Sequence, residues 1–388
     1  MRYKFYYGGW YQRTTLHLSE IYGFLHNGYT ELPLNKEKLN RNLELLDLNK
    51  VERKNDYLEF ILASNTDGID IKYFEDGLYV LETESNEIEA GKEKLESYFS
   101  EKFNPAISYL FSLGAPTPKI LANIKQSHPL VVVVESKTHS KYEVDKKMFG
   151  DVYSVVDSKK FTVYKTPNYI VIAVDPNSTQ EVTNLVCMQI FFREFKDQLE
   201  KYLNIHRKIW EDITLIKDSG SIKGSQIVKN RMKLDSYDRS ISLINNRINQ
   251  MGTYVKTRQS ISKDLGIEDH LTKVFDYKFE TLVNTLSYIK EIWAMTRDYV
   301  KNVISILSDI ENQSLNNSIK SLQIITSIGV VSGILGYLSK NELPRITSAG
   351  FEYLILLLLS TFIINFLIVS YYRNIKYKIK ISDLSDKL

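Results

Sequence analysis

Two apolar runs near the C-terminal end constrain this chain more than any other feature. Residues 322–338 read LQIITSIGVVSGILGYL without a charge, and residues 351–372 contain only Glu352. The hydrocarbon core of a bilayer needs about 20 apolar residues of helix, with about 17 as the lower limit. The alternative is a buried hairpin in a large soluble core, but the second run is apolar on every helical face. We therefore predict two membrane-spanning helices joined by an outer loop over residues 339–350.

The flanking residues predict the orientation of these spans. The first residues, MRYKFYYGGWYQ, lack the apolar segment and cleavage site of a signal peptide, so the long first part of the chain is expected in the cytoplasm. Two spans return the C-terminus to the same side. The basic tail over residues 373–388, with Arg373, Lys376, Lys378 and Lys380, agrees with the excess of positive residues in cytoplasmic segments. We expect a multi-pass plasma-membrane protein with both termini in the cytoplasm and the lipid bilayer as a partner.

Composition excludes several functional classes. The 388 residues include 50 basic and 47 acidic side chains, so the charge balance gives no argument for nucleic acid. Cys187 is the single cysteine, which excludes an internal disulfide and a Cys-based zinc site. No HExxH or GxGxxG motif occurs. Because Glu135, His139 and Asp175 form no recognisable catalytic pattern, we expect no enzyme and no tightly bound cofactor.

Residues 1–177 have the pattern of an α/β domain. Short apolar runs predict strands at 57–63, 69–73, 78–81, 130–134, 151–156, 161–164 and 169–174, and residues 84–113 predict a helix. Asp76-Gly77 is a typical hairpin turn because glycine tolerates a positive φ. The run LVVVV at 130–134 is typical of a strand buried on both faces, so helices are expected to cover the sheet.

Residues 178–265 predict a helical hairpin. One helix is expected from about 181 to 216, and a Gly/Ser turn over 218–224 separates it from a second helix ending near 265. Ser178 and Glu181 have the spacing of a capping box at the start of the first helix.

Residues 266–321 predict a stalk helix that begins near Ile267 and continues into the first span. An apolar seam runs at spacings of three and four through Leu271, Val274, Lys278, Leu282, Leu286, Ile289, Trp293, Thr296, Val300, Val303, Leu307 and Ile310. A polar stripe runs through Asn302, Ser305, Asp309, Asn312, Asn316 and Gln323. The stalk would be roughly 75 to 80 Å long. The expected fold is an α+β membrane protein with an N-terminal cytoplasmic α/β domain, a long helical stalk and a C-terminal two-helix transmembrane hairpin.

The polar stripe continues into the first span, over residues 322–338. Gln323 and Thr326 lie where unpaired polar groups are costly and usually face a bundle interior or a water-filled path. One hairpin cannot enclose a path, but several copies can do so with their first spans around a common axis. We therefore expect a cyclic homo-oligomer.

This layout resembles that of the CorA-type magnesium transporters, which are homopentamers. Asn316-Asn-Ser-Ile-Lys320-Ser-Leu-Gln-Ile-Ile-Thr-Ser327 looks like that family's approach to its first span. The resemblance implies that Asn316 rings the inner pore, that Ile319 and Leu322 form an apolar constriction, and that Lys320 points to the headgroups. The pore-lining set implied in this way is Asn316, Ile319, Leu322, Gln323, Thr326 and Val330.

The outer mouth departs from that family. Its Gly-Met-Asn signature holds a hydrated Mg²⁺, and the matching residues here are Gly336, Tyr337 and Leu338. Leucine offers no polar group to a hydrated cation, and Asn341 is the alternative donor nearby. The transported cation is therefore left open between Mg²⁺ and a transition metal.

Two functions from different classes follow. The first is a CorA-like oligomeric channel or transporter that moves divalent cations across the plasma membrane and is gated by its cytoplasmic domain. In it, Asp309 first and Asp298 next would bind cations between subunits and hold the pore closed, because removing the ion leaves repelling carboxylates. The alternative is a non-conducting, membrane-anchored oligomeric scaffold or sensor with a cytoplasmic partner-binding domain.

Overall fold

The structure is a computed structural model that describes residues 2–12, 17–113, 128–338 and 348–378. The chain forms two compact units. Unit 1 comprises Met1–Ile205 and Leu243–Ile292, and unit 2 comprises His206–Ser242 and Trp293–Leu388. Three long helices, α7 (Thr179–Asp218), α8 (Gly224–Asp264) and α10 (Phe279–Leu338), contribute residues to both.

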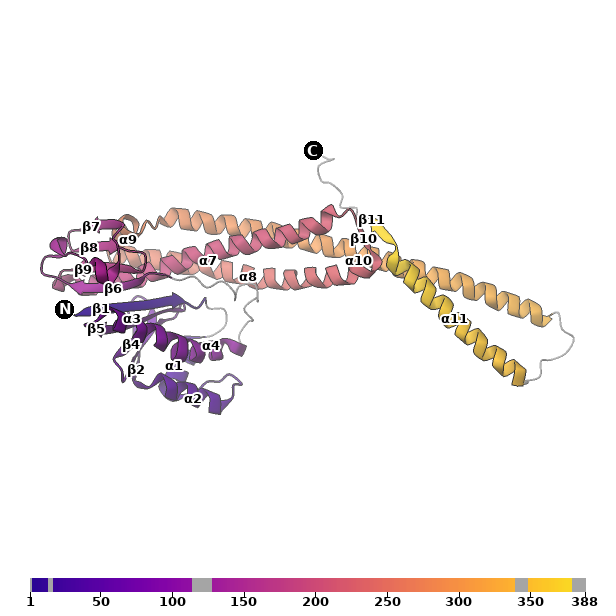
Figure 1. Cartoon of the computed structure of the whole chain (residues 1–388), viewed down its shortest axis with the longest axis horizontal. Helices are drawn as coiled ribbons and strands as arrows, with labels where there is room; N and C mark the ends of the chain where they lie inside the picture. Colours follow the sequence, from indigo (N-terminus) through magenta and orange to yellow (C-terminus); the bar gives the residue numbers. More distant parts are fainter. Residues whose placement is uncertain (1, 13–16, 114–127, 339–347, 379–388) are drawn as a thin grey trace, which may run out of the picture. The chain divides into compact units, whose positions relative to one another are not determined.

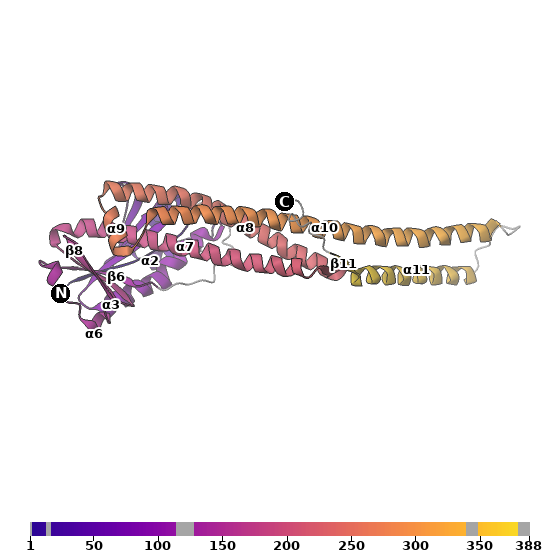
Figure 2. The same ribbon diagram turned by 90° about the horizontal axis from the view of Figure 1, so that it is seen from above.

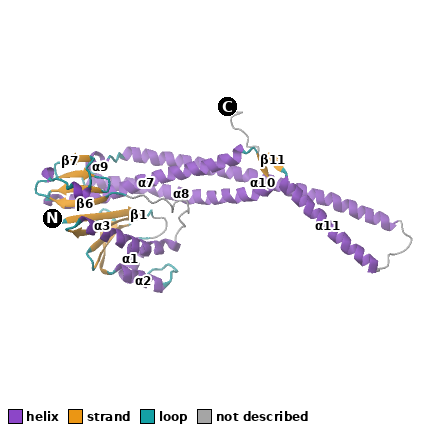
Figure 3. Cartoon of the chain, in the orientation of Figure 1, coloured by secondary structure: helices purple, strands orange, loops and turns teal. Residues whose placement is uncertain are grey.

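Unit 1 is built on a nine-stranded sheet (Figures 1 and 3). Its strands are β1 (Tyr3–Trp10), β2 (Leu48–Asn55), β3 (Glu59–Asn65), β4 (Ile69–Phe74), β5 (Leu78–Ser85), β6 (Leu130–Glu135), β7 (Ser154–Asp157), β8 (Phe161–Lys165) and β9 (Tyr169–Val174). The spatial order is β2-β3-β4-β5-β1-β6-β9-β8-β7. Every neighbouring pair is antiparallel except β6 and β9, which are parallel. All seven predicted strands are present, whereas β1 and β2 were not predicted.

Helices cover both faces of this sheet, as its buried central strands require. The first five residues of β6 are buried, and β1 lies beside it. On one face, the Phe5 ring lies so close to Gly91 that a Cβ there would be 2.4 Å from it. On the other face, the Tyr6 hydroxyl lies 3.1 Å from Thr183 Oγ1 of α7.

The helices of the first face follow the predicted positions in part. They are α1 (Leu18–Asn27), α2 (Lys36–Leu46), α3 (Ile88–Ser97) and α4 (Asn104–Leu110). The helix predicted over 84–113 is present as α3, a π-helical turn at Tyr98–Phe103, α4 and a short 3-10 turn at Phe111–Leu113. The described part of unit 1 also contains a short helix, α6 (Lys146–Phe149), and 3-10 turns at His139–Lys141 and Pro176–Ser178.

A buried ion pair joins the β4–β5 turn to α8. Gly77 has a φ of 88°, which confirms the predicted turn. The Asp76 carboxylate accepts hydrogen bonds from Arg258 Nε at 2.7 Å and from Arg258 Nη2 at 2.9 Å. Both side chains are 2% exposed. The guanidinium also lies 4.6 Å from the centre of the Phe74 ring. A buried charge is tolerable only when it is paired and hydrogen-bonded, as here.

The two predicted hairpin helices are confirmed to within a few residues as α7 and α8. The predicted capping box is wrong. The Asp175 side chain accepts a hydrogen bond from the Asn177 amide, and Ser178 lies in the 3-10 turn that precedes α7. The Glu181 carboxylate instead accepts a hydrogen bond from Lys160 at 2.6 Å.

The predicted single stalk helix is interrupted. Helix α9 (Glu268–Phe275) ends at Asp276, which has a φ of 59°, and α10 begins at Phe279. The amides of Asp276 and Tyr277 bond to the carbonyls of Thr272 and Leu271, a Schellman-type end. Because Asp tolerates the left-handed conformation, the helix stops without Gly or Pro. The uninterrupted part before residue 322 is therefore about 65 Å long.

Unit 2 contains most of α10, which is one unbroken helix of 60 residues (Figure 2), and α11 (Ser348–Asn374). Segments Phe279–Gly336 and Ile355–Asn374 are long and apolar enough to cross a membrane. Most large apolar side chains of α11 and of α10 beyond Ile319 are exposed in the single chain, with Phe362 71% exposed. Of the predicted outer loop, residues 339–347 lie outside the described residues, as do residues 379–388 of the tail.

Unit 2 also contains an unpredicted two-stranded sheet. Strands β10 (Ser221–Lys223) and β11 (Lys376–Lys378) pair antiparallel. The segment 218–224 was predicted as a plain Gly/Ser turn, and that prediction is wrong for its last residues. They form a strand because the chain after α11 returns to pair with them.

Removing one partner of the buried pair tests its role in unit 1. Asp76→Ala leaves the Arg258 charge buried and unpaired, so we expect the free energy of opening of β4 and β5 to fall by about 3–5 kcal/mol. Amide hydrogen exchange of these strands in the full-length protein measures it. The control is Asp151→Ala, whose exposed carboxylate lies 4.0 Å from Lys146 and whose loss should change the value by under about 0.5 kcal/mol. Equal effects in both variants would contradict the assignment.

Candidate functional site

Helix α10 buries one face from its start to Ile310. The predicted seam is confirmed within α10, where its members are at most 7% exposed: Leu282, Leu286, Ile289, Trp293, Thr296, Val300, Val303, Leu307 and Ile310. Lys278, the remaining polar member, is exposed and precedes α10. This face of α10 is therefore occupied within a single chain.

The opposite face carries the predicted polar stripe. At about 100° per residue, spacings of three and four place its members on one line, and those before the apolar segment are all exposed: Asn302, Ser305, Asp309, Asn312 and Asn316. Asp298, four residues before Asn302, lies on the same line and is exposed as well. Among the described residues, no cation lies within ion-pair distance of Asp298 or Asp309. These two carboxylates are 11 residues apart, about 16 Å along the helix, so they cannot share one ion within a chain.

The stripe continues along the apolar part of α10. Ile319, Gln323 and Val330 are exposed on the same face, whereas Leu322 is half-buried and lies nearer the seam than the stripe. The Thr326 hydroxyl donates a hydrogen bond to the Leu322 carbonyl, so its polar group is satisfied inside the helix. Of the predicted outer mouth, Gly336 is described and exposed. The side chains of Tyr337 and Leu338, and the whole of Asn341, lie outside the described residues.

The end of α11 and the tail contact the buried-seam side of α10. Ser321 Oγ lies 2.9 Å from the Tyr372 hydroxyl, and the Tyr377 hydroxyl donates a hydrogen bond of 2.9 Å to Ser314 Oγ. Ser314 and Ser321 are one heptad apart and lie on the same side of the helix as Leu307. The polar stripe is therefore left uncovered by α11 at this level.

The sheet of β10 and β11 fixes the turn between α7 and α8 against the end of α11. The Gly224 amide donates a hydrogen bond to the Ile375 carbonyl at 3.1 Å. A Cβ on Gly224 would lie 2.7 Å from the Tyr372 carbonyl oxygen, so only glycine permits this approach. Local sequence contains no signal for this contact, because each strand has three residues and its partner is distant in the chain.

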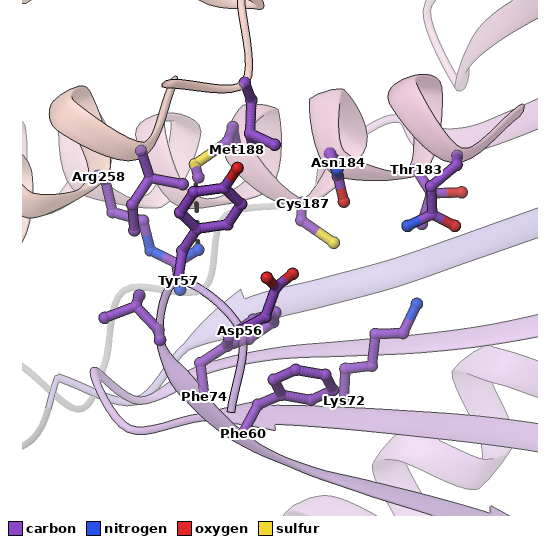
Figure 4. A pocket seen from close by; sticks show the side chains of 14 residues that line it. Asp56, Tyr57, Phe60, Lys72, Phe74, Thr183, Asn184, Cys187, Met188 and Arg258 are labelled. Atoms are coloured by element: carbon purple, nitrogen blue, oxygen red, sulfur yellow. Dashed lines mark hydrogen bonds between the residues drawn. The ribbon is translucent and has the colours of Figure 1, made fainter. Parts of the chain in front are cut away.

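Unit 1 contains a pocket of about 120 Å³ between β3, β4, α7 and α8 (Figure 4). Two of its charged groups are already paired, whereas Asp56, which also lines it, has no ion-pair partner among the described residues. Arg258 binds Asp76, and Lys72 Nζ lies 3.3 Å from the Glu82 carboxylate. Burial lowers the pKa of Lys72, but neighbouring negative charge including Glu82 outweighs it, and the pKa is raised overall. Among the described lining residues there is no histidine to activate Cys187, so the pocket offers no nucleophile and base.

One further cluster could in principle hold a metal. Ligand atoms of His128, Glu194 and Asp197 lie within 4.8 Å of one another. Each has a protein partner, because His128 Nε2 is 2.7 Å from Asp197 and Arg193 is 2.8 Å from Glu194. A cation would have to displace both contacts. We interpret the cluster as an ion-pair network of unit 1.

The isolated polar groups of unit 1 also have structural partners. Glu135 accepts a hydrogen bond from Thr179, the ring nitrogens of His139 lie 3.1 Å from Thr162 Oγ1 and 3.2 Å from the Lys159 carbonyl, and Asp175 caps a 3-10 turn. The Glu268-Asp269 pair forms the acidic first turn of α9, where it complements the helix dipole.

Compared with protein-family models, with curated proteins and with solved structures, the chain matches none. The arrangement that most constrains function is the uncovered polar face of α10, which runs from Asp298 to Val330 on a helix whose opposite face is buried as far as Ile310.

Cys187 provides a test of the packing of unit 1. Burial raises the pKa of its thiol, so little thiolate forms near neutral pH and reagents cannot reach it. We expect alkylation in the folded full-length protein to be at least about a hundredfold slower than in denaturant. Mass spectrometry over time measures the rate on this single cysteine. Rapid native labelling would contradict the packing of α7 on the sheet.

Proposed function

We propose that this chain forms an oligomeric, CorA-like channel or transporter for divalent metal cations. In this proposal α10 and α11 span the plasma membrane, both termini lie in the cytoplasm, and the polar face of α10 from several copies lines a central path. The cation is the substrate, and it also acts as a regulator when it binds the cytoplasmic part of α10.

One observation carries the proposal. A single helix extends from the water-soluble part of unit 2 into a segment of membrane-spanning composition, and its polar face stays uncovered throughout. Because α11 contacts the seam side, it leaves the Asn316–Gln323 face open. Polar residues in a membrane usually face a bundle interior or a water-filled path. A ring of copies with α10 inside and α11 outside would give these polar residues a bundle interior that encloses a water-filled path.

Oligomerisation also accounts for the carboxylates. Asp298 and Asp309 lack cationic partners among the described residues and are too far apart to share an ion within one chain. In a ring, each forms a layer of like charges around the axis, which favours a bound cation between subunits. A subunit number of five rests on the family resemblance alone.

The alternative is a non-conducting membrane-anchored scaffold or sensor. Two features favour it, namely the Thr326 hydroxyl, which is satisfied within its own helix, and the Gly-Tyr-Leu sequence at the place of a polar mouth. Under this alternative the polar face of α10 packs against copies of itself without water.

Cation flux into liposomes separates the two functions. We expect purified protein to admit Mg²⁺, Co²⁺, Ni²⁺ or Zn²⁺, reported by trapped indicators, and Asn316→Leu to reduce the initial rate several-fold by placing an apolar ring where the path narrows. The matched control is Asn317→Leu, the same change on the adjacent residue and outside the stripe. Folded, oligomeric protein that admits none of these ions would instead establish the scaffold.

Regulation by cations is tested at the acidic layers. Asp309→Asn removes the carboxylates that bind the closing ion, so we expect the cytoplasmic cation concentration that halves the flux to rise by about fivefold or more. Asp298→Asn should act in the same direction but more weakly. The control is Glu211→Gln, an exposed acid on α7. An unchanged half-inhibitory concentration in both aspartate variants would remove the regulatory role and leave conduction intact.

A further inference from the structure

The two-stranded sheet of unit 2 has two chemically different faces. Lys223 lies directly opposite Lys376, and Ser221 lies opposite Lys378. Since side chains alternate along a strand, these four share one face. The other face carries Ile222, which is 3% exposed, and Tyr377, which bonds to Ser314 of α10. One face therefore packs inward and the other presents three lysines, all exposed.

This arrangement carries a cost that nothing within the described residues offsets. Like charges directly opposite on neighbouring strands destabilise their pairing. Among the residues whose side chains the structure describes, which do not include Lys217 and Asp218, no carboxylate lies within ion-pair distance of Lys223, Lys376 or Lys378. Residues 219–229 and 371–378 include five basic and no acidic side chains: Lys223, Lys229, Arg373, Lys376 and Lys378. An anion from outside the chain would therefore stabilise the pairing of β10 with β11.

The position of the sheet indicates which anion. The membrane-length segment of α11 ends at Asn374, two residues before Lys376, and two extended residues span at most about 7 Å. The lysines must therefore lie at the headgroup level when α11 is inserted. Helix α8 begins at Gly224, immediately after Lys223, and its first amides add positive charge.

We propose that the face formed by Ser221, Lys223, Lys376 and Lys378 binds the phosphate of an anionic phospholipid headgroup. The phosphate neutralises the opposed lysines and holds β10 against β11, so the lipid fixes the turn between α7 and α8 to the end of α11. This site rests on the bilayer insertion in the proposed function but not on conduction.

Lipid binding is measured on the full-length protein by native mass spectrometry in detergent. We titrate phosphatidylglycerol and, separately, phosphatidylcholine. We expect the wild-type protein to retain phosphatidylglycerol preferentially. The variant Lys223→Gln/Lys376→Gln/Lys378→Gln should bind it at least about tenfold more weakly, since each basic side chain near an anionic surface contributes roughly a fivefold factor. The control Lys278→Gln/Lys290→Gln/Lys301→Gln removes the same charge from exposed positions outside the sheet and should bind as the wild type does.

A single substitution should change the stability of the β10–β11 pairing and the affinity for lipid in opposite directions. Lys376→Gln removes the cross-strand repulsion, so without anionic lipid its β10–β11 amides should exchange no faster than in the wild type, while its affinity for phosphatidylglycerol falls. A purely structural lysine would lose protection instead. Faster exchange with unchanged lipid affinity would overturn the proposal, and the expected pair of results would support it.

Two further experiments distinguish failure of the lipid site from failure of the proposed function. If inorganic phosphate at millimolar concentration displaces the lipid completely, the site takes free phosphate and the lipid proposal is overturned. Alkaline carbonate extraction of vesicles tests insertion, and released protein would overturn both the lipid site and the proposed function. Inserted protein with no lipid preference overturns the lipid site alone. Inserted protein that retains the lipid but conducts no ion supports the lipid site and overturns conduction.

Discussion

The proposed function depends on the two different faces of α10, one buried and apolar and the other exposed and polar. An unbroken ladder of backbone hydrogen bonds keeps its side chains in register from Phe279 to Leu338, so a residue near the start and one in the apolar segment remain on a common face. The buried seam fixes how the helix is rotated, because nine of its side chains are almost fully enclosed. Once that rotation is set, the direction in which Asn316 points is set as well.

Unit 1 is held together by a different kind of constraint. Its sheet carries helices on both faces, and the Asp76–Arg258 pair joins the tip of a β-hairpin to α8 near the C-terminal end of that helix. Apolar contacts alone depend little on direction, whereas the bidentate hydrogen bonds from Arg258 to Asp76 require one geometry. The Arg258 guanidinium also lies over the rings of Phe74 and Phe191. The same pair engages the Arg258 guanidinium that lines the neighbouring pocket.

Sequence predicted the elements whose signals are local. Helices α7 and α8 are periodic and are separated by Gly and Ser, and β6 is a continuous apolar run, so each was found within a few residues. Strand β1 escaped because Gly8-Gly9 resembles a turn, and β2 because its sequence, LNKVERKN, is almost wholly polar. The α9–α10 break was missed because Asp276 supplies the left-handed residue in place of glycine.

In the candidate site, too, the feature with a local signal could be predicted and the long-range one could not. The spacing of the stripe from Asn302 to Gln323 could be predicted because one helix carries all of its members. The sheet of β10 and β11 could not, because its two strands are separated by the whole of α8, α9, α10 and α11.

That separation has a consequence for biosynthesis. Strand β10 emerges early from the ribosome, and its partner emerges only after both apolar segments have been made. Until then β10 presents an unpaired edge, and the bond from Gly224 to Ile375 cannot form. Docking of β11 therefore reports that the hairpin of α10 and α11 is complete. This pairing lies just beyond the end of α11 and can form only after α11 has been made.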